Sequence, residues 1–299
     1  MCKHRLGVPE SSVHGFEENM KKKRGTIILI LLFLLGLLIV LYPTISNRWN
    51  KRHASRAIAS YNEAMELLEE EDYSGIWEEA ERFNEGIRMT EKLTTLTEEE
   101  MEEYKSLIDP VGTGMMGYLV IDSIDVYMPI YHSVDEAVLQ VAIGHLPESS
   151  LPTGGKGNHI ALSGHRGLPS ARILTDLDQL REGDVFFLTI MDRTLAYEVD
   201  QIRIVLPEEV EDLMIDPEED YCTLITCTPY GVNSHRMLVR GVRSDAVMGA
   251  ERRFVGPDAI AIDTIFVSIA IAIPILVILL VVMLVRTSKK KTDGREEEE

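Results

Sequence analysis

The chain is poor in basic residues relative to acidic ones: 30 Lys and Arg stand against 49 Asp and Glu in 299 residues, a formal net charge of −19. A protein with this balance repels the phosphates of nucleic acid unless a basic face is segregated on it. The basic residues are clustered, but they lie beside long apolar segments. We therefore expect no nucleic-acid partner.

Several short motifs that would carry other chemistry are missing. No HExxH or CxxC motif occurs, so the sequence offers no set of zinc ligands at short spacing. There is also no Gly-rich phosphate loop and no GxSxG nucleophile elbow. These absences predict that the protein uses neither a metal nor a bound cofactor.

Cysteine is scarce, and its placement matters. Besides Cys2 there are only Cys222 and Cys227, both in the strand-like stretch YCTLITCTPYG at 221–231. Residues five apart on a strand point to opposite faces and lie about 16 Å apart, too far for a disulfide. We interpret Cys222 as a core residue. Cys227 is either an inert core cysteine or a reactive thiol at the end of a strand.

Long uncharged apolar segments are present at both ends of the chain. Residues 26–42 and 264–285 are each long enough to cross a bilayer, and Pro274 is tolerated inside a membrane helix. The first follows a Lys-Arg cluster and precedes no small-x-small cleavage site, which favours an uncleaved anchor over a signal peptide. We expect a two-pass protein of the cell membrane, with residues 44–263 outside the cell and both termini in the cytoplasm.

Between the two apolar segments, the sequence pattern changes from one typical of helices to one typical of β-strands. Residues 47–88 have apolar residues at helical spacing among many Glu, and Thr97 followed by Glu100 is a capping-box pattern that opens another helix. From Gly117 onward, short β-branched segments alternate with turns, such as MDRT. This pattern predicts an acidic helical stalk followed by an antiparallel barrel or sandwich.

A thiol becomes a useful nucleophile when an imidazole or a cation favours its thiolate form. His165 lies in a Gly-flanked turn that ends a strand, ALSGHRG, and His159 begins the same strand. If the loop TPYGVNS closes a hairpin, Arg236 lies across from Cys227. Other histidines in the β-rich region are His132, His145 and His235.

These stretches together resemble the sortase transpeptidases, in particular the class C, pilus-assembling group. The resemblance covers about 117–242 and rests on TLITC at 223–227, TPYGVNSHRMLVRG after it, and HIALSGHRGLPSARILTDLDQL at 159–180. It implies a mainly β fold: an eight-stranded sortase β-barrel preceded by a helical segment and flanked by two transmembrane helices. It also implies Cys227 as nucleophile, His165 as general acid and base, and Arg236 as the residue that positions substrate or stabilises the oxyanion.

The resemblance further implies cleavage of an LPxTG-like sorting signal between Thr and Gly through a thioacyl intermediate. In the class C group the acceptor is a pilin lysine amine, so the expected partners are pilin or surface-protein precursors that bear LPxTG. The second membrane segment is also typical of that group. Two alternatives stay open: a sortase that anchors single surface proteins to the cell wall, and a non-catalytic barrel that serves as a membrane-held scaffold.

Two stretches depart from simple expectation. The upstream Asp109-Pro110 is followed by Val111, whereas many class C relatives carry an Asp-Pro-aromatic lid, so we interpret it as a helix stop and expect Cys227 to be accessible. LPTGG at 151–155 lacks the residue between Pro and Thr of a sorting signal and is predicted to be a surface loop.

The expected organisation divides the chain into seven segments. They are a cytoplasmic tail at 1–25, a transmembrane helix at 26–43, an extracytoplasmic helical stalk at 44–110, a catalytic barrel at 111–245, a linker at 246–263, a transmembrane helix at 264–285 and a cytoplasmic tail at 286–299.

Overall fold

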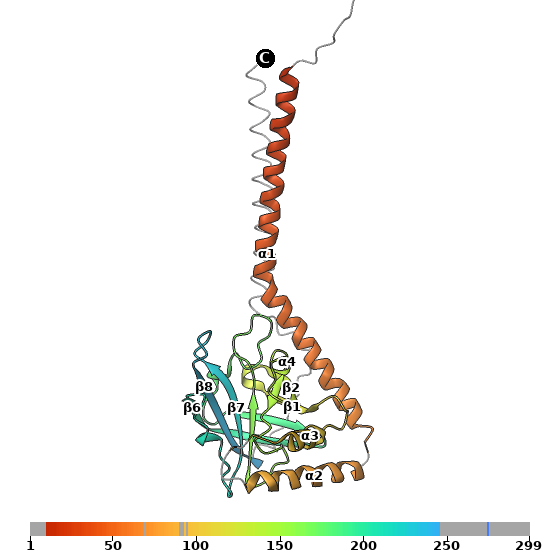
Figure 1. Ribbon diagram of the computed structural model, residues 1–299, viewed down its shortest axis with the longest axis vertical. Coiled ribbons are helices and arrows are strands. Elements are labelled where there is room, and N and C mark those ends of the chain that lie inside the picture. Colours follow the sequence, from red (N-terminus) through yellow and green to blue (C-terminus); the bar gives the residue numbers. More distant parts are fainter. Residues whose placement is uncertain (1–9, 69, 90–92, 94, 246–273, 275–299) are drawn as a thin grey trace, which may run out of the picture. The chain divides into compact units, whose positions relative to one another are not determined.

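A computed structural model describes residues 10–68, 70–89, 93, 95–245 and 274. The order of its main elements is three helices, a strand pair, a short helix and six further strands (Figure 1). The linker at 246–263 and the second predicted membrane segment at 264–285, Pro274 apart, lie outside the described residues, as does the C-terminal tail. Nothing in the described part of the chain therefore bears on a second crossing of the membrane.

The helix α1 runs from Glu10 to Met65 without interruption and contains Pro43. Within the described residues one helix, Ile30–Met65, is long and apolar enough to cross a membrane. On the predicted first span, large apolar residues have more than half of their surface exposed, as at Leu31, Leu35 and Leu38. Exposed apolar surface on every side of a helix suits lipid rather than water.

The two following helices are α2 (Glu70–Arg88) and α3 (Glu98–Ser106). The predicted capping box is confirmed: the Thr97 hydroxyl accepts from the backbone N–H of Glu100, whose carboxylate accepts from the backbone N–H of Thr97. After α3 ends, the Asp109 carboxylate accepts hydrogen bonds from the backbone N–H groups of Thr113 and Gly114. Asp109-Pro110 therefore belongs to the turn that leads from α3 into the barrel.

Eight strands close into a barrel in the order β1-β2-β3-β4-β7-β8-β6-β5, as the resemblance implied. The strands are β1 (Met115–Ile121), β2 (Val126–His132), β3 (Ile143–His145), β4 (Asn158–Ser163), β5 (Val185–Ile190), β6 (Arg193–Val205), β7 (Asp220–Thr228) and β8 (His235–Arg243). A short helix, α4 (Glu136–Leu139), lies between β2 and β3, and three 3-10 turns lie at Asp122–Ile124, Leu177–Gln179 and Glu211–Leu213.

The purely antiparallel arrangement that the strand pattern predicted is wrong in two places. The β2–β3 and β4–β7 pairs are parallel, while the other neighbours are antiparallel. Parallel neighbours need a long crossover instead of a tight turn, and the β5–β6 hairpin lies within the connection from β4 to β7. Alternating short strands in a sequence do not reveal such crossovers.

Apolar side chains from all sides fill the barrel and continue under the helices. Strand residues such as Leu119, Ile130 and Leu224 are fully buried, and so are Ile58 of α1 and Tyr104 of α3. The helices predicted as a stalk thus contribute to the same hydrophobic core as the strands.

Tyr61 shows how α1 is attached to the barrel. Its hydroxyl donates to the carbonyl of Met116 at 2.7 Å and accepts from the N–H of Met191 at 2.8 Å. Because both partners belong to buried backbone, losing the hydroxyl would leave a donor and an acceptor unsatisfied.

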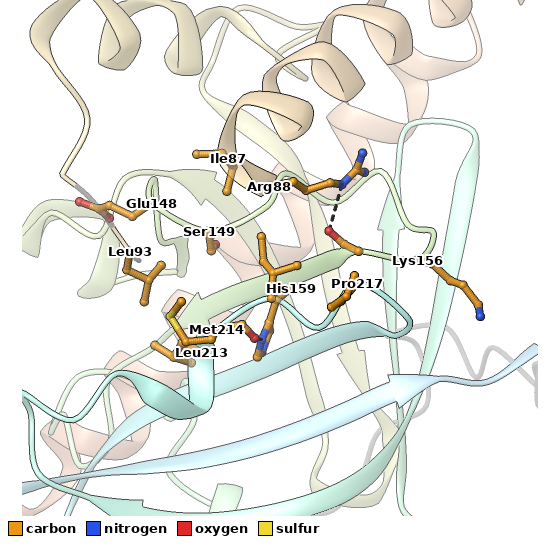
Figure 2. A pocket seen from close by; sticks show the side chains of 12 residues that line it. Ile87, Arg88, Leu93, Glu148, Ser149, Lys156, His159, Leu213, Met214 and Pro217 are labelled. Carbon is orange, nitrogen blue, oxygen red and sulfur yellow. Dashed lines mark hydrogen bonds between the residues drawn. The ribbon is translucent and has the colours of Figure 1, made fainter. Parts of the chain in front are cut away.

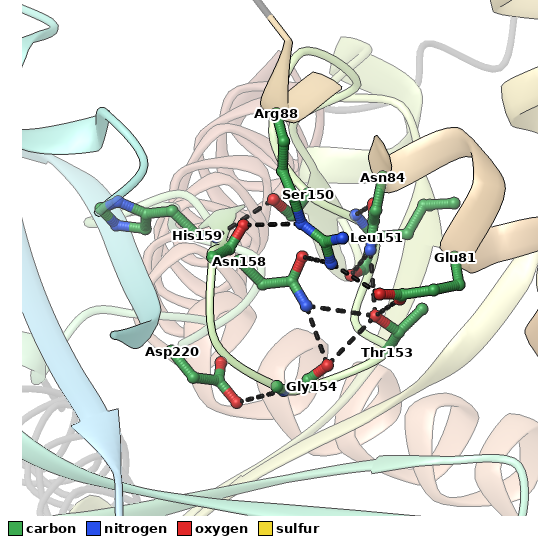
Figure 3. Close-up of polar contacts among 12 residues, drawn as sticks. Glu81, Asn84, Arg88, Ser150, Leu151, Thr153, Gly154, Asn158, His159 and Asp220 are labelled. Carbon is green, nitrogen blue, oxygen red and sulfur yellow. Dashed lines mark hydrogen bonds and ion pairs between the residues drawn. The ribbon is translucent and has the colours of Figure 1, made fainter. Parts of the chain in front are cut away.

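The surface loop predicted for LPTGG is wrong. Leu151 and Thr153 are buried, because side chains of α2 cover them (Figure 3). Asn84 donates to the Leu151 carbonyl at 3.0 Å and accepts from its N–H at 2.7 Å, and Glu81 accepts from the Thr153 hydroxyl at 2.8 Å. Arg88 closes the network by binding Glu81 and the Gly157 carbonyl. This stretch has a structural role, because it is covered by α2, a helix that is distant from it in the sequence.

Candidate active site

The three predicted site residues lie at one end of three adjacent strands. In the β7–β8 hairpin Cys227 is paired directly with Arg236, as predicted. On the other side of β7, parallel pairing with β4 runs to Ser163 opposite Ile225, and the Gly164 N–H continues it by donating to the Ile225 carbonyl at 3.0 Å. The turn that carries His165 therefore follows directly after this pairing, at the same strand end as Cys227.

Cys227 is half-buried on the outer face of β7, and Cys222 is fully buried inside the barrel. Both cysteines are free, which agrees with the expectation that they point to opposite faces. Burial raises the pKa of the Cys222 thiol, so this residue stays protonated. Of the two, only Cys227 is accessible to solvent.

His165 has one carboxylate partner. Its Nε2 lies 3.2 Å from a carboxylate oxygen of Glu136, the first residue of α4, and its side chain is 26% exposed. Hydrogen bonds from Gln140 and then from His165 lower the pKa of Glu136, which therefore carries a negative charge beside the imidazole. The carboxylate lies within hydrogen-bond distance of the ring and can orient it.

Arg236 holds its guanidinium near the end of the hairpin loop. Its Nη1 donates to the carbonyls of Asn233 at 3.3 Å and of its neighbour His235 at 3.2 Å. No carboxylate of the described residues forms an ion pair with Arg236. A guanidinium held only by backbone carbonyls keeps donors for an anionic or carbonyl oxygen.

The loop that carries His165 is held in place by its own side chains. Arg166 forms an ion pair with Asp178 and donates to the Thr228 hydroxyl at 3.5 Å, next to Cys227. Gly167 has φ +84°, and a Cβ there would lie 2.7 Å from the ring of Tyr230. The close approach of that ring requires glycine, which explains the second glycine of SGHRG.

The same loop also touches α1. Asn47 accepts a hydrogen bond from the Arg172 N–H, and Asn50 donates to the Ser170 carbonyl, both at 2.9 Å. These contacts connect the His165 loop with the part of α1 that follows the apolar segment.

The other candidate histidines have structural surroundings. His145 bonds the Tyr104 hydroxyl and the Ser150 carbonyl, each at 2.9 Å, and burial lowers its pKa to about 3. His159 is also buried, with a pKa lowered to about 4. His132 bonds the carbonyls of Leu107 and Gly114, and His235 bonds Ser234. None of the four is paired with a carboxylate of the described part of the chain.

Sequence reasoning missed Glu136 and did not single out Arg166. Glu136 lies 29 positions before His165, and no local pattern connects the two. Arg166 was visible within the SGHRG motif, but its pairing with Asp178 depends on how the loop folds back. In the described residues no group of three or more His, Cys, Asp or Glu is arranged to hold a metal ion.

Comparisons with known proteins agree with this geometry. The sortase domain family model matches residues 119–244, which span almost the whole barrel. The crystal structure of sortase C1 from Streptococcus agalactiae is 46% identical, with a TM-score of 0.62, and the match covers 63% of this chain and 98% of that one. The chain belongs to the sortase family.

Further relatives point to the class C group, as the sequence predicted. Streptococcus pneumoniae sortase C is 38% identical, with a TM-score of 0.57 over 63% of this sortase and 96% of that chain. Sortase A of Bacillus anthracis is 30% identical over 127 residues, 42% of this sortase and 59% of the relative. This sortase therefore spans less than two thirds of that curated relative, whereas it covers nearly all of the solved class C chains.

Proposed function

We propose that the protein is a membrane-anchored cysteine transpeptidase that cleaves an LPxTG-like sorting signal and transfers the acyl group to a pilin lysine amine. The observation that carries this proposal is the strand register around Cys227, with Arg236 opposite it on β8 and the His165 turn beside it on β4. Nucleophile, proton carrier and oxyanion donor at one strand end are what acyl transfer requires.

The first half of the reaction forms a thioester. The Cys227 thiolate attacks the carbonyl carbon of the signal's Thr, and Arg236 donates hydrogen bonds to the oxyanion that develops. When the C–N bond breaks, His165 gives its proton to the departing Gly amine. The Thr carbonyl carbon is then bound to the Cys227 sulfur.

The second half transfers the acyl group. A lysine amine attacks the thioester, His165 takes a proton from the attacking nitrogen, and the C–S bond breaks to return the thiolate. The product is an isopeptide bond, and the imidazole and thiolate are back in their starting forms. Repetition on successive pilin subunits yields a polymer.

Support for pilin as the substrate comes from the relatives. The chain covers nearly the full length of several solved class C sortases, and the Streptococcus pneumoniae enzyme is described in terms of pilin substrate specificity. The apolar helix Ile30–Met65 supports membrane anchoring, which would hold the enzyme beside substrates in the same membrane.

Intact-mass analysis of the detergent-solubilised chain, mixed with an LPxTG peptide, tests the first half-reaction. We expect an adduct that ends at the peptide's Thr in the wild type, and none in Cys227→Ala. Cys222→Ala is the matched control, since the buried thiol should be dispensable for acylation. An adduct of equal yield in Cys227→Ala, or none in the wild type with several signal variants, would support the non-catalytic scaffold instead.

Addition of an acceptor then tests the second half-reaction. We expect the adduct to disappear with formation of an isopeptide when a pilin domain that bears the acceptor lysine is added. Consumption by a cell-wall peptide amine but not by the pilin would identify an enzyme that anchors single proteins.

A further inference from the structure

A pocket of about 450 Å³ opens beside the start of β4, where His159 belongs to its lining (Figure 2). Much of its lining is apolar and comes from two places, the end of α2 with Leu93, and the loop between β6 and β7. The apolar residues among its lining are Ile87, Leu93, Leu213, Met214, Ile215 and Pro217. A pocket of this size and lining suits apolar side chains of a ligand.

Several polar groups around the pocket are already engaged, whereas the lining carboxylate of Glu148 forms no ion pair within the described residues (Figure 2). His159 donates from Nδ1 to the Met214 carbonyl at 2.9 Å, and its Nε2 lies 2.7 Å from the Thr223 hydroxyl. At the rim, Arg88 is bonded to Glu81 and the Gly157 carbonyl, and Lys156 forms an exposed ion pair with Glu218 (Figures 2 and 3). The pocket would therefore bind an occupant mainly through apolar contact area, and less through unpaired charge.

The pocket and Cys227 lie along the same face of the barrel, with buried side chains between them. Side chains at alternate positions of a strand face the same side, so His159 and Ala161 on β4, and Thr223, Ile225 and Cys227 on β7, share the outer face. Ala161 packs in a small apolar cluster with Leu213 and Leu238, and Ile225 borders this cluster. Because Leu213 also lines the pocket, the cluster connects the pocket to the strand end that bears Cys227.

The distance along this surface selects what can occupy the pocket. Thr223, bonded to His159, precedes Cys227 by four positions, and Tyr221, paired with His159, precedes it by six. At about 3.3 Å per residue these positions lie roughly 13 to 20 Å from Cys227. In an extended substrate with its Thr carbonyl at Cys227, the same span falls on the one to three residues that precede the motif's Leu.

We propose that this pocket is a specificity subsite for an apolar side chain in the three residues upstream of the sorting motif. The proposal rests on the proposed function and deepens it: the pocket binds a side chain of the segment that joins the motif to the folded substrate. Recognition would then extend beyond LPxTG, so that the enzyme discriminates among precursors that share the same motif.

Four peptides test this proposal with the detergent-solubilised full chain. One carries Ser at all three upstream positions, and each of the others carries a single Leu at one of them. The rate of thioacyl formation at low peptide concentration gives kcat/KM for each. We expect one Leu peptide to exceed the Ser peptide by about tenfold, the typical value of an apolar side chain in a fitted pocket. Only side chains that face the pocket should gain.

Two variants locate the effect. Met214→Glu places a carboxylate in the pocket lining, and we expect it to bring the Leu-to-Ser ratio close to one. Val210→Ala alters an exposed residue of the same loop that does not line the pocket, and the ratio should keep its wild-type value.

The outcomes separate the two proposals. Equal rates for all four peptides in the wild type, or a preference that survives in Met214→Glu, would overturn the subsite while leaving the sortase reaction intact. No adduct with any of the peptides would overturn the proposed function itself. The wild-type ratio alone decides against the subsite, so the test does not depend on how well Met214→Glu folds.

Discussion

The histidines at the two ends of β4 differ in solvent exposure and in hydrogen bonding. His159, near its start, is 1% exposed, and both ring nitrogens are hydrogen-bonded to the protein. His165, just past its end, is 26% exposed and has an exposed carboxylate as its partner. Both belong to the same face of the strand, so orientation alone does not separate them. The difference arises because the β6–β7 loop covers one end of the face through the Met214 carbonyl and leaves the other end open.

This comparison shows which histidine of this face the proposed mechanism can use. Burial lowers the pKa of His159, whose two bonded nitrogens hold the β6–β7 loop and β7 in place, whereas His165 is accessible to a substrate. The assignment therefore follows from coverage and partners, and each of the next three predictions alters one side of the contrast.

The largest effect is expected from removing the exposed histidine. His165→Ala should lower the rate of amine transfer by about 10²- to 10⁴-fold, because general acid and base catalysis contributes that much. The unfolding temperature should stay close to that of the wild type, since the side chain is outside the core. A steady-state transfer assay measures the rate, and a thermal melt measures the unfolding temperature. A fall in unfolding temperature without loss of transfer would show that His165 has a structural role instead of a catalytic one.

The buried histidine should govern stability instead. Its pKa is lowered to about 4 in the folded protein, so between pH 6.5 and 4 the unfolded chain binds a proton that the folded one does not. This stability is present above pH 6.5 and is lost as the pH falls toward 4, by about 3 kcal/mol at 1.4 kcal/mol per pH unit.

Denaturant unfolding of wild type and His159→Gln from pH 7 to pH 4 measures this contribution. Glutamine removes the titration, so the difference in free energy of unfolding between the two proteins should narrow as the pH falls. His145→Gln is a parallel case, because burial lowers its pKa to about 3. A difference that stays constant over this range would show that His159 does not titrate with folding.

The smallest effect is expected at Glu136. Replacing it by Gln keeps the shape and removes the charge beside His165, and an exposed ion pair of this kind contributes little. We expect kcat to fall by about threefold with KM unchanged, and the loss to shrink at high salt, where the wild-type pair is already screened. Assays of both proteins at two ionic strengths measure this, with Glu218→Gln as the control, because Glu218 forms an exposed ion pair with Lys156 and precedes the start of β7, whereas Cys227 lies near its end. A loss as large as that of His165→Ala would give the carboxylate a direct part in the chemistry.

Local features of the sequence predicted local structure correctly. The capping box at Thr97, the opposite orientations of Cys222 and Cys227, and the two-residue turn between β5 and β6 each depend on neighbours a few residues away. Predictions failed where distant segments meet. LPTGG was predicted to be a surface loop because no residue near it in the sequence indicates that Asn84 of α2 forms hydrogen bonds with its backbone.

The sequence by itself determined that Arg236 lies opposite Cys227, because a hairpin closed by a short loop pairs its strands through turn geometry that is encoded locally. It also determined that residues 26–42 form an apolar helix, since composition alone decides that. Only the tertiary structure decided that β4 pairs with β7, which brings the turn after β4 to the strand end that bears Cys227, and that one end of this face is covered while the other stays open. The physical reason is that parallel pairing joins strands across a long crossover, and the free energy that selects the partner comes from packing of the whole barrel.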